Sequence, residues 1–172
     1  LRTRDGERIS DLVARGDQVQ WATKKFRLEL AAWTHPDTTH ANSGIPHYSL
    51  DSNDLLTYAE PHVIRTFDLG NGQAAKDRDI ALYSPGLCVV GTAYDNSHAW
   101  LEAGEGLAHL LLLARHHHVY ASFLNQPIEV EDLRPRVART IRSNGHAQLI
   151  LRLGYGAHVN PTPRRTVAEV LI

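Results

Sequence analysis

Histidine and cysteine are the side chains most often used for metal binding and nucleophilic catalysis, and this chain has eleven histidines and one cysteine. Three histidines, His116–His118, are consecutive, so on a helix they point about 100° apart and cannot converge on one ion. No HExxH motif or comparable ligand spacing is present. We therefore predict no metal site. We place these histidines at the surface or at a helix end, where imidazolium suits the helix dipole.

Other sequence motifs for common chemistries are also missing. Cys88 lies in the apolar run Leu87–Val90, which favours a core thiol over a nucleophile. The hydrolase motif GxSxG, the phosphate loop GxxxxGK[ST] and a GxGxxG motif preceding a helix are all absent. We name no catalytic side chain.

Two segments remain that could bind a ligand, Phe123–Pro127 and Pro163–Arg165. A double arginine beside prolines could hold an anion such as phosphate rigidly. The first segment could present backbone N–H and C=O groups to a flat molecule. The alternative is that the first is a connector between helices and the second a solvated charge pair, and composition alone favours this alternative.

The element that must position the first segment is a predicted helix over Trp100–Arg115. Its apolar residues recur at steps of three and four, and no proline interrupts it. From Leu107 to Ala114 the apolar surface nearly closes around the helix, which is typical of a helix in a protein interior or at an interface. Gly104 and Gly106 would give it a flat spot for close approach of another helix or a flat ligand. We expect residues Ala121–Pro127 to form a loop after it.

The first third of the chain reads as two helices followed by a long polar stretch. Ile9, Leu12 and Val13 share one face of a short amphipathic segment after a charged, frayed start. A hinge is expected near Gly16-Asp17, where Asp17 and Gln20 resemble a capping box. Residues 34–54 are polar and rich in turn formers, which predicts a functional loop, a lid or disorder. A short helix is expected at Leu55–Glu60.

The remainder alternates predicted strands, loops and helices. Asp68–Asp79 reads as a loop, and Ile80–Tyr83 and Leu87–Thr92 read as strands. A helix is expected around Val130–Ile141, followed by a strand of alternating faces over Ala147–Gly154. The fold class is therefore α+β or α/β, with helices on both sides of a small sheet.

Length and composition agree with one ordinary globular domain. The chain has 172 residues, 42% hydrophobic and 22% charged, with a net charge of −1. This charge gives no sign of a nucleic-acid partner, and no apolar run approaches the ~20 residues of a membrane span. A cytoplasmic protein is the default expectation. Because the sequence contains no methionine, we expect a processed, cleaved or partial chain.

Taken in order, these pieces resemble the C-terminal half of a flavin-dependent nitroreductase. The resemblance covers most of the chain and is best from Ala93 to Leu171, in "WLEAGEGLAHLLLLARHHHVYASFLNQPIE", "LRLGY" and "PTPRRTVAEVL". It is closest to the Acg-like branch, in which two nitroreductase-like halves are fused; "FRLELAAW" and "SGIP" also resemble that branch. The resemblance implies an α+β, nitroreductase-like fold, with a mixed sheet sandwiched between helical layers. We treat residues 1–172 as one such domain or half-domain.

The resemblance also implies FMN as cofactor. Phe123, Leu124, Asn125 and Gln126 match the loop beside the flavin ring, which makes contact largely through its backbone. Arg164 or Arg165 matches the arginine that holds the FMN phosphate. Only Arg2-Thr3-Arg4 weakly resembles the family's arginine/serine-rich phosphate motif. The usual glycines of the flavin loop are replaced by Asn125 and Gln126. A second half or a homodimer partner is therefore expected to complete the site, with the helix over Trp100–Arg115 at the contact.

The implied activity is that of an FMN-dependent NAD(P)H oxidoreductase, which passes electrons to a nitro or quinone-like acceptor. We expect neither a nucleic-acid nor a membrane partner. Two alternatives remain: an Acg-type protein that sequesters FMN with little or no turnover, and a structural half that completes a flavin site. Fold resemblance cannot choose among the three.

Overall fold

The computed structural model describes residues 3–35, 42–46, 66, 68–158 and 161–171. These residues form two compact units, which we describe separately. Unit 1 comprises the chain up to Gln20 together with Gly70–Gly156, and unit 2 comprises Trp21–Leu69 and Ala157–Ile172. The fold is α+β, as the sequence predicted. The predicted helix at Leu55–Glu60 and most of the predicted lid lie outside the described residues.

A three-stranded antiparallel sheet forms the centre of unit 1, in the order β3-β5-β4. The strands are β3 (Gly86–Thr92), β4 (Tyr120–Phe123) and β5 (His146–Gly154). Leu151 of β5 pairs with Cys88 on one side and with Phe123 on the other. The register shifts between Val90 and Gly91, where β3 has an irregularity.

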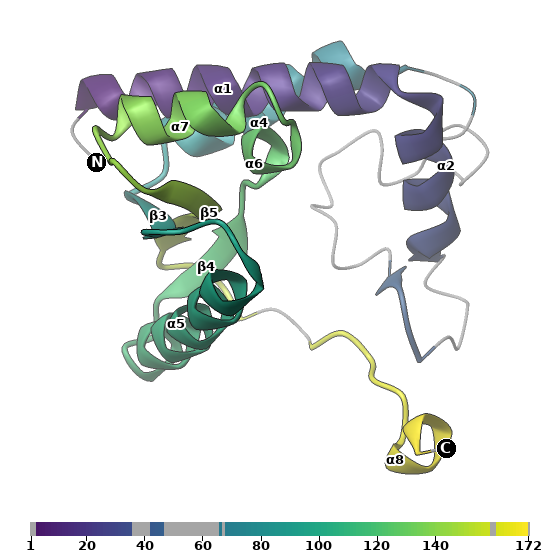
Figure 1. Cartoon of the computed structure of the whole chain (residues 1–172). Coiled ribbons are helices and arrows are strands. Elements are labelled where there is room, and N and C mark those ends of the chain that lie inside the picture. The colour runs from purple at the N-terminus through teal and green to yellow at the C-terminus, as the bar shows by residue number, and fades with distance from the viewer. Residues whose placement is uncertain (1–2, 36–41, 47–65, 67, 159–160, 172) are drawn as a thin grey trace. The chain divides into compact units, whose positions relative to one another are not determined.

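Helices cover both faces of this sheet. α1 (Thr3–Ala22), α4 (Gly70–Leu82), α6 (Gln126–Glu129) and α7 (Arg134–Thr140) lie on one side, and α5 (Ser97–His116) lies on the other (Figure 1). Ile150 and Leu151 are neighbours in β5, so they point to opposite faces, and both are fully buried. The strand was predicted to have alternating, unequal faces, and at Ile150 and Leu151 both faces are buried. As the central strand, β5 is covered on both sides.

The hydrophobic core lies between the sheet and the helices on the α1 side. Ile9, Leu12 and Val13 enter it from α1, as their spacing predicted. The other buried members are Ala81, Leu124, Leu133, Val137, Ala147 and Ile150. Full burial of an aliphatic side chain stabilises the folded state by roughly 1.5–3 kcal/mol, so this cluster holds the helical layer to the sheet.

The predicted hinge at Gly16-Asp17 was wrong. α1 continues through these residues to Ala22, and the chain turns at Thr23 before α2 (Lys24–Trp33). A Cβ atom on Gly16 would lie 2.6 Å from the backbone carbon of Gln126, so the glycine lets α1 pass close to α6. Asp17 is buried inside the helix and is not an N-cap, which also excludes the predicted capping box.

Four further secondary-structure predictions need correction. The predicted loop Asp68–Asp79 and strand Ile80–Tyr83 are replaced largely by α4, because Ala74 and Ala81 pack against other elements. The charged start predicted to be frayed belongs to α1 from Thr3 onward. The predicted helix Val130–Ile141 is shorter, as α7 begins only at Arg134. The predicted strands Leu87–Thr92 and Ala147–Gly154 and the helix Trp100–Arg115 are confirmed, each with slightly wider bounds.

Unit 2 has less regular structure. Trp21 and Ala31, the latter in α2, form a small buried cluster in this unit. The rings of Trp21 and Phe26 meet edge to face, with 6.0 Å between their centroids. The two-residue strands β1 (Thr34–His35) and β2 (Ile45–Pro46) pair in parallel, and α8 (Val167–Val170) follows near the end of the chain. Of the helices that the structure describes, none combines the length and apolar character needed to cross a bilayer.

Candidate functional site

The segment predicted to contact a flavin, Phe123–Gln126, joins β4 to α6. Its first residue ends β4 opposite Leu151. The backbone N–H of Leu124 donates to the carbonyl of Ile150 at 2.9 Å, and the N–H of Ile150 donates to Oδ1 of Asn125 at 2.9 Å. Asn125 therefore continues the strand ladder with its side chain. The predicted loop Ala121–Pro127 was wrong in part, because Ala121–Phe123 pairs with β5 as part of the strand β4.

The four side chains of this segment have different environments. Leu124 is 3% exposed and belongs to the core. Asn125 is bonded to β5, and Nε2 of Gln126 donates to Asp77 at 2.9 Å. Phe123 is 50% exposed at the end of the edge strand β4. A flat ligand here would contact the Phe123 ring and the main chain, since the other three side chains are used in packing or internal hydrogen bonds.

Gln126 belongs to a buried polar junction that sequence reasoning missed. Asp17 of α1 is 3% exposed and faces Asp77 of α4 and Gln126 of α6. Asp77 also accepts a hydrogen bond from Gln73 at 3.1 Å. Among the described residues, Oδ2 of Asp17 and Oε1 of Gln126 have no hydrogen-bond partner. The junction thus brings two carboxyl groups together under three helices.

Burial raises the pKa of Asp17 to about 8, and the nearby Asp77 carboxylate adds to the shift, while a hydrogen bond with Gln126 opposes it. Asp17 is therefore largely protonated at neutral pH and can share its proton with Asp77. The pair could hold a proton, but its burial between helices indicates a role in packing. The only sign of this junction in the sequence is that Asp17 lies on the same helical face as Val13, four residues before it, and Gln20, three residues after it.

A second polar cluster lies at the start of α5, around Asp95. Its carboxylate accepts a two-pronged contact from Arg134 at 2.8 and 2.9 Å and a hydrogen bond from Trp100 Nε1 at 2.7 Å. Gln148 donates to it at 3.3 Å, and Arg134 Nε donates to the carbonyl of Ala147 at 2.8 Å. The bond from Trp100 and those from Arg134 hold the pKa of Asp95 well below its usual range.

The contacts of Asp95 indicate a structural role. They join the loop after β3 to β5 and α7, and they occupy both carboxylate oxygens. A cavity of about 570 Å³ opens beside this cluster, lined in part by His146 and Glu131. The sequence did not reveal Asp95 or Arg134 as partners, because two residues 39 positions apart leave no local pattern.

Arg164 and Arg165, predicted to hold a phosphate, are exposed residues of unit 2. Nη1 of Arg164 donates to Thr162 Oγ1 at 2.5 Å and to the carbonyl of Pro163 at 3.1 Å. Thr166 and Glu169 form a capping box at the start of α8, directly after the arginines. The hydrogen bond from the Thr166 backbone lowers the pKa of Glu169. The flavin-ring and phosphate segments thus belong to different units.

The histidine run lies where it was predicted. His116 is in the last turn of α5 and His117 caps it, and all three histidines are exposed. In the described part of the chain no group of three or more histidine, cysteine or acidic side chains is arranged to hold a metal ion. Cys88 is a free, half-buried thiol in β3.

Comparison of the chain with protein-family models, with curated proteins and with solved structures gives no match in any of the three.

Proposed function

We propose that this chain is a nitroreductase-like half of an FMN-dependent oxidoreductase that transfers electrons from NAD(P)H to a nitro or quinone-like acceptor. The observation that carries the proposal is the ordered resemblance from Ala93 to Leu171, in which the α5, Phe123–Gln126 and Pro163–Arg165 segments follow one another as in that family. When bound, FMN supplies the hydride and electron transfer.

Two groups of described residues, one in each unit, could each bind a part of FMN. Phe123, the last residue of the edge strand β4, offers an exposed ring suited to contact with a flat ring system. Arg164 and Arg165 offer two exposed guanidinium groups, and the Arg164 side chain is already ordered by Thr162 and Pro163. Guanidinium groups can bind phosphate through two parallel hydrogen bonds. Leu124, Asn125 and Gln126 could contribute only those main-chain groups that are not already bonded, because the N–H of Leu124 donates to Ile150 and the carbonyl of Asn125 accepts from Ile128 and Glu129.

The exposed surface of α5 supports the expected partner. This helix buries only Ala99 and Ala103 within the described structure. Trp100 and Leu101 remain 55% and 71% exposed, and Leu112 and Leu113 remain 70% and 61% exposed. Exposed apolar surface of this extent is typical of an interface. We propose that a second nitroreductase-like half, or a second copy of this chain, covers it.

FMN binding is tested by fluorescence quenching with the chain in its assembled form, as a self-associated complex or together with its second half. We expect Arg164→Ala or Arg165→Ala to weaken FMN binding about ten- to a hundredfold, because a charge-assisted contact to phosphate contributes roughly 1.5–3 kcal/mol. Arg→Lys should recover only part of the loss, since lysine keeps the charge without the fork.

Two controls accompany this titration. Riboflavin lacks the phosphate and should bind wild type and arginine variants equally, and Lys25→Ala, which removes an exposed charge from α2, should leave FMN binding unchanged. Wild-type affinity for FMN in both arginine variants would contradict the assignment. Addition of NADH or NADPH then separates the candidates: bleaching of the visible flavin absorbance indicates an oxidoreductase, and persistent colour indicates an FMN-holding protein without turnover.

A further inference from the structure

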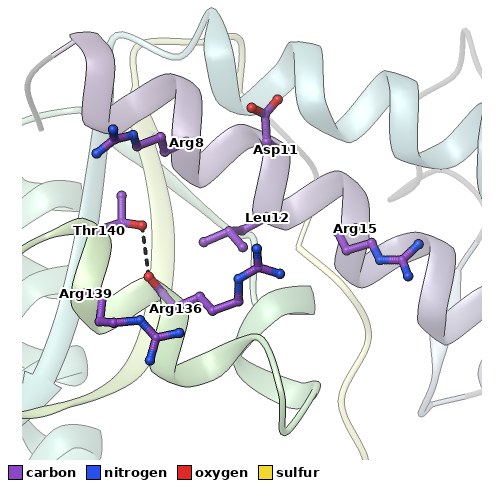
Figure 2. Close-up of a pocket in the computed structure, with 7 residues that line it drawn as sticks. All are labelled: Arg8, Asp11, Leu12, Arg15, Arg136, Arg139 and Thr140. Atoms are coloured by element: carbon purple, nitrogen blue, oxygen red, sulfur yellow. Dashed lines mark hydrogen bonds between the residues drawn. The ribbon is translucent and has the colours of Figure 1, made fainter.

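A pocket lined by four arginines lies between α1 and α7, outside the predicted FMN segments. It is an open depression with a volume of about 570 Å³, within the range of small-molecule sites. Arg8 and Arg15 line it from α1, and Arg136 and Arg139 line it from α7. Leu12, Asp11 and Thr140 complete the lining (Figure 2).

Packing explains why the arginines gather here. α7 is held against α1 by the core residues Leu133 and Val137, which contact the cluster that contains Ile9 and Val13. The polar faces of both helices therefore flank the same seam, and each contributes two arginines. The positive charge is a local accumulation, since the whole chain carries a net charge of −1.

The acidic residue of the pocket does not neutralise this charge. Oδ1 of Asp11 accepts a hydrogen bond from Arg78 of α4 at 2.8 Å, and Asp11 points away from the arginines of α7 (Figure 2). Arg15 donates to the neutral side chain of Gln18 at 3.2 Å. No carboxylate of the described residues pairs with Arg8, Arg136 or Arg139. Four guanidinium groups thus lie around one opening with no carboxylate partner among the described residues.

The spacing of these groups favours a ligand with several phosphates. Arg8 and Arg15 are seven residues apart, about 10 Å along the helix at 1.5 Å per residue. Figure 2 shows Arg136 extending from α7 toward α1, between the positions of these two residues. One phosphate has only four oxygens and cannot accept paired hydrogen bonds from all four guanidinium groups, whereas a chain of two or three phosphates can bridge neighbouring groups in this way. The volume of the pocket suits a small molecule.

We propose that this pocket binds a small molecule that carries two or more linked phosphate groups. The site is independent of the flavin proposal, because it shares no residue with the predicted FMN segments. Its ligand chemistry is that of pyrophosphate, tripolyphosphate or a nucleoside triphosphate.

Isothermal titration calorimetry of the full chain tests the proposal, with tripolyphosphate, pyrophosphate, orthophosphate and ATP as probes. We expect tripolyphosphate and pyrophosphate to bind at least tenfold more tightly than orthophosphate. Tighter binding of ATP than of tripolyphosphate would assign the pocket to a nucleotide, and equal binding would assign it to the phosphate chain alone; both results support the site. No binding of any polyphosphate at millimolar concentration would overturn it.

Two double variants, one on each helix, separate a loss of binding from a loss of folding, because both should weaken binding although they change different helices. Arg136→Gln with Arg139→Gln, and Arg8→Gln with Arg15→Gln, should each weaken tripolyphosphate binding tenfold or more. Lys24→Gln with Lys25→Gln is the matched control, because it removes the same charge from exposed positions of α2 and should have little effect. Equal losses in the control and arginine variants would indicate unspecific attraction and overturn the proposal. Stronger binding of a DNA duplex than of tripolyphosphate would do the same.

Discussion

Asp17, Asp77 and Gln126 meet in a buried junction, and the ionisation of Asp17 is therefore coupled to folding. Its pKa is about 8 in the folded protein, compared with an ordinary value of 3.8. The folded state consequently holds more protons than the unfolded state between about pH 4 and pH 8. Stability from this group is fully present at low pH and is lost as the pH rises through this interval.

The variant Asp17→Asn keeps the shape of the side chain and removes its charge. We expect it to raise the free energy of unfolding by about 1–3 kcal/mol at pH 8.5, because a charged group no longer has to be buried, and to change it little at pH 4. Urea unfolding at both pH values measures the difference. Asp132→Asn, at an exposed position, is the control, and an equal change in the two variants would contradict the coupling.

At the scale of elements, the contact of α1 with α6 depends on Gly16. Alanine normally stabilises a helix by up to about 1 kcal/mol relative to glycine. At Gly16, however, the added Cβ would lie 2.6 to 2.9 Å from backbone and side-chain atoms of Gln126, which must then move. We expect Gly16→Ala to lower the free energy of unfolding by about 1–3 kcal/mol, as overpacking does elsewhere.

Gly6 provides a matched control in the same helix, because a Cβ there would meet nothing within 4 Å. Gly6→Ala should raise the free energy of unfolding by roughly 0.5–1 kcal/mol. Opposite signs for the two substitutions, measured by urea unfolding, are the expected result. Stabilisation by both would mean that α1 and α6 do not approach each other closely at Gly16.

For the whole molecule, the exposed apolar surface of α5 predicts association. We expect the chain to form a complex whose interface exceeds ~1,000 Å², by self-association when purified alone. Leu112→Glu with Leu113→Glu should dissociate it, because charges would then be buried in an apolar contact. Leu28→Glu, at a 44% exposed position of α2, is the control. Light scattering after size exclusion gives the mass, and a stable wild-type monomer would contradict the prediction.

The sequence by itself determined the elements that have a strong local period. β3, α5 and β5 follow directly from continuous or periodic apolar residues, and Ile9, Leu12 and Val13 were identified as one buried face. The α+β class follows from these elements. The helix-end position of the histidines was also predictable, because it depends only on the helix that precedes them.

Tertiary structure decided what depends on residues far apart in the chain. The first turn of α4 contains Gly70 and Gly72, so its sequence resembles a loop. The helix is stabilised by the burial of Ala74 and Ala81. β4 exists because β5 pairs with it, and α1 passes through Gly16 because Gln126 lies against it. The Asp17 junction, the Asp95 cluster and the arginine pocket each join two or more elements across long sequence separations. No local pattern records such contacts, since packing brings the side chains together only after the elements have formed.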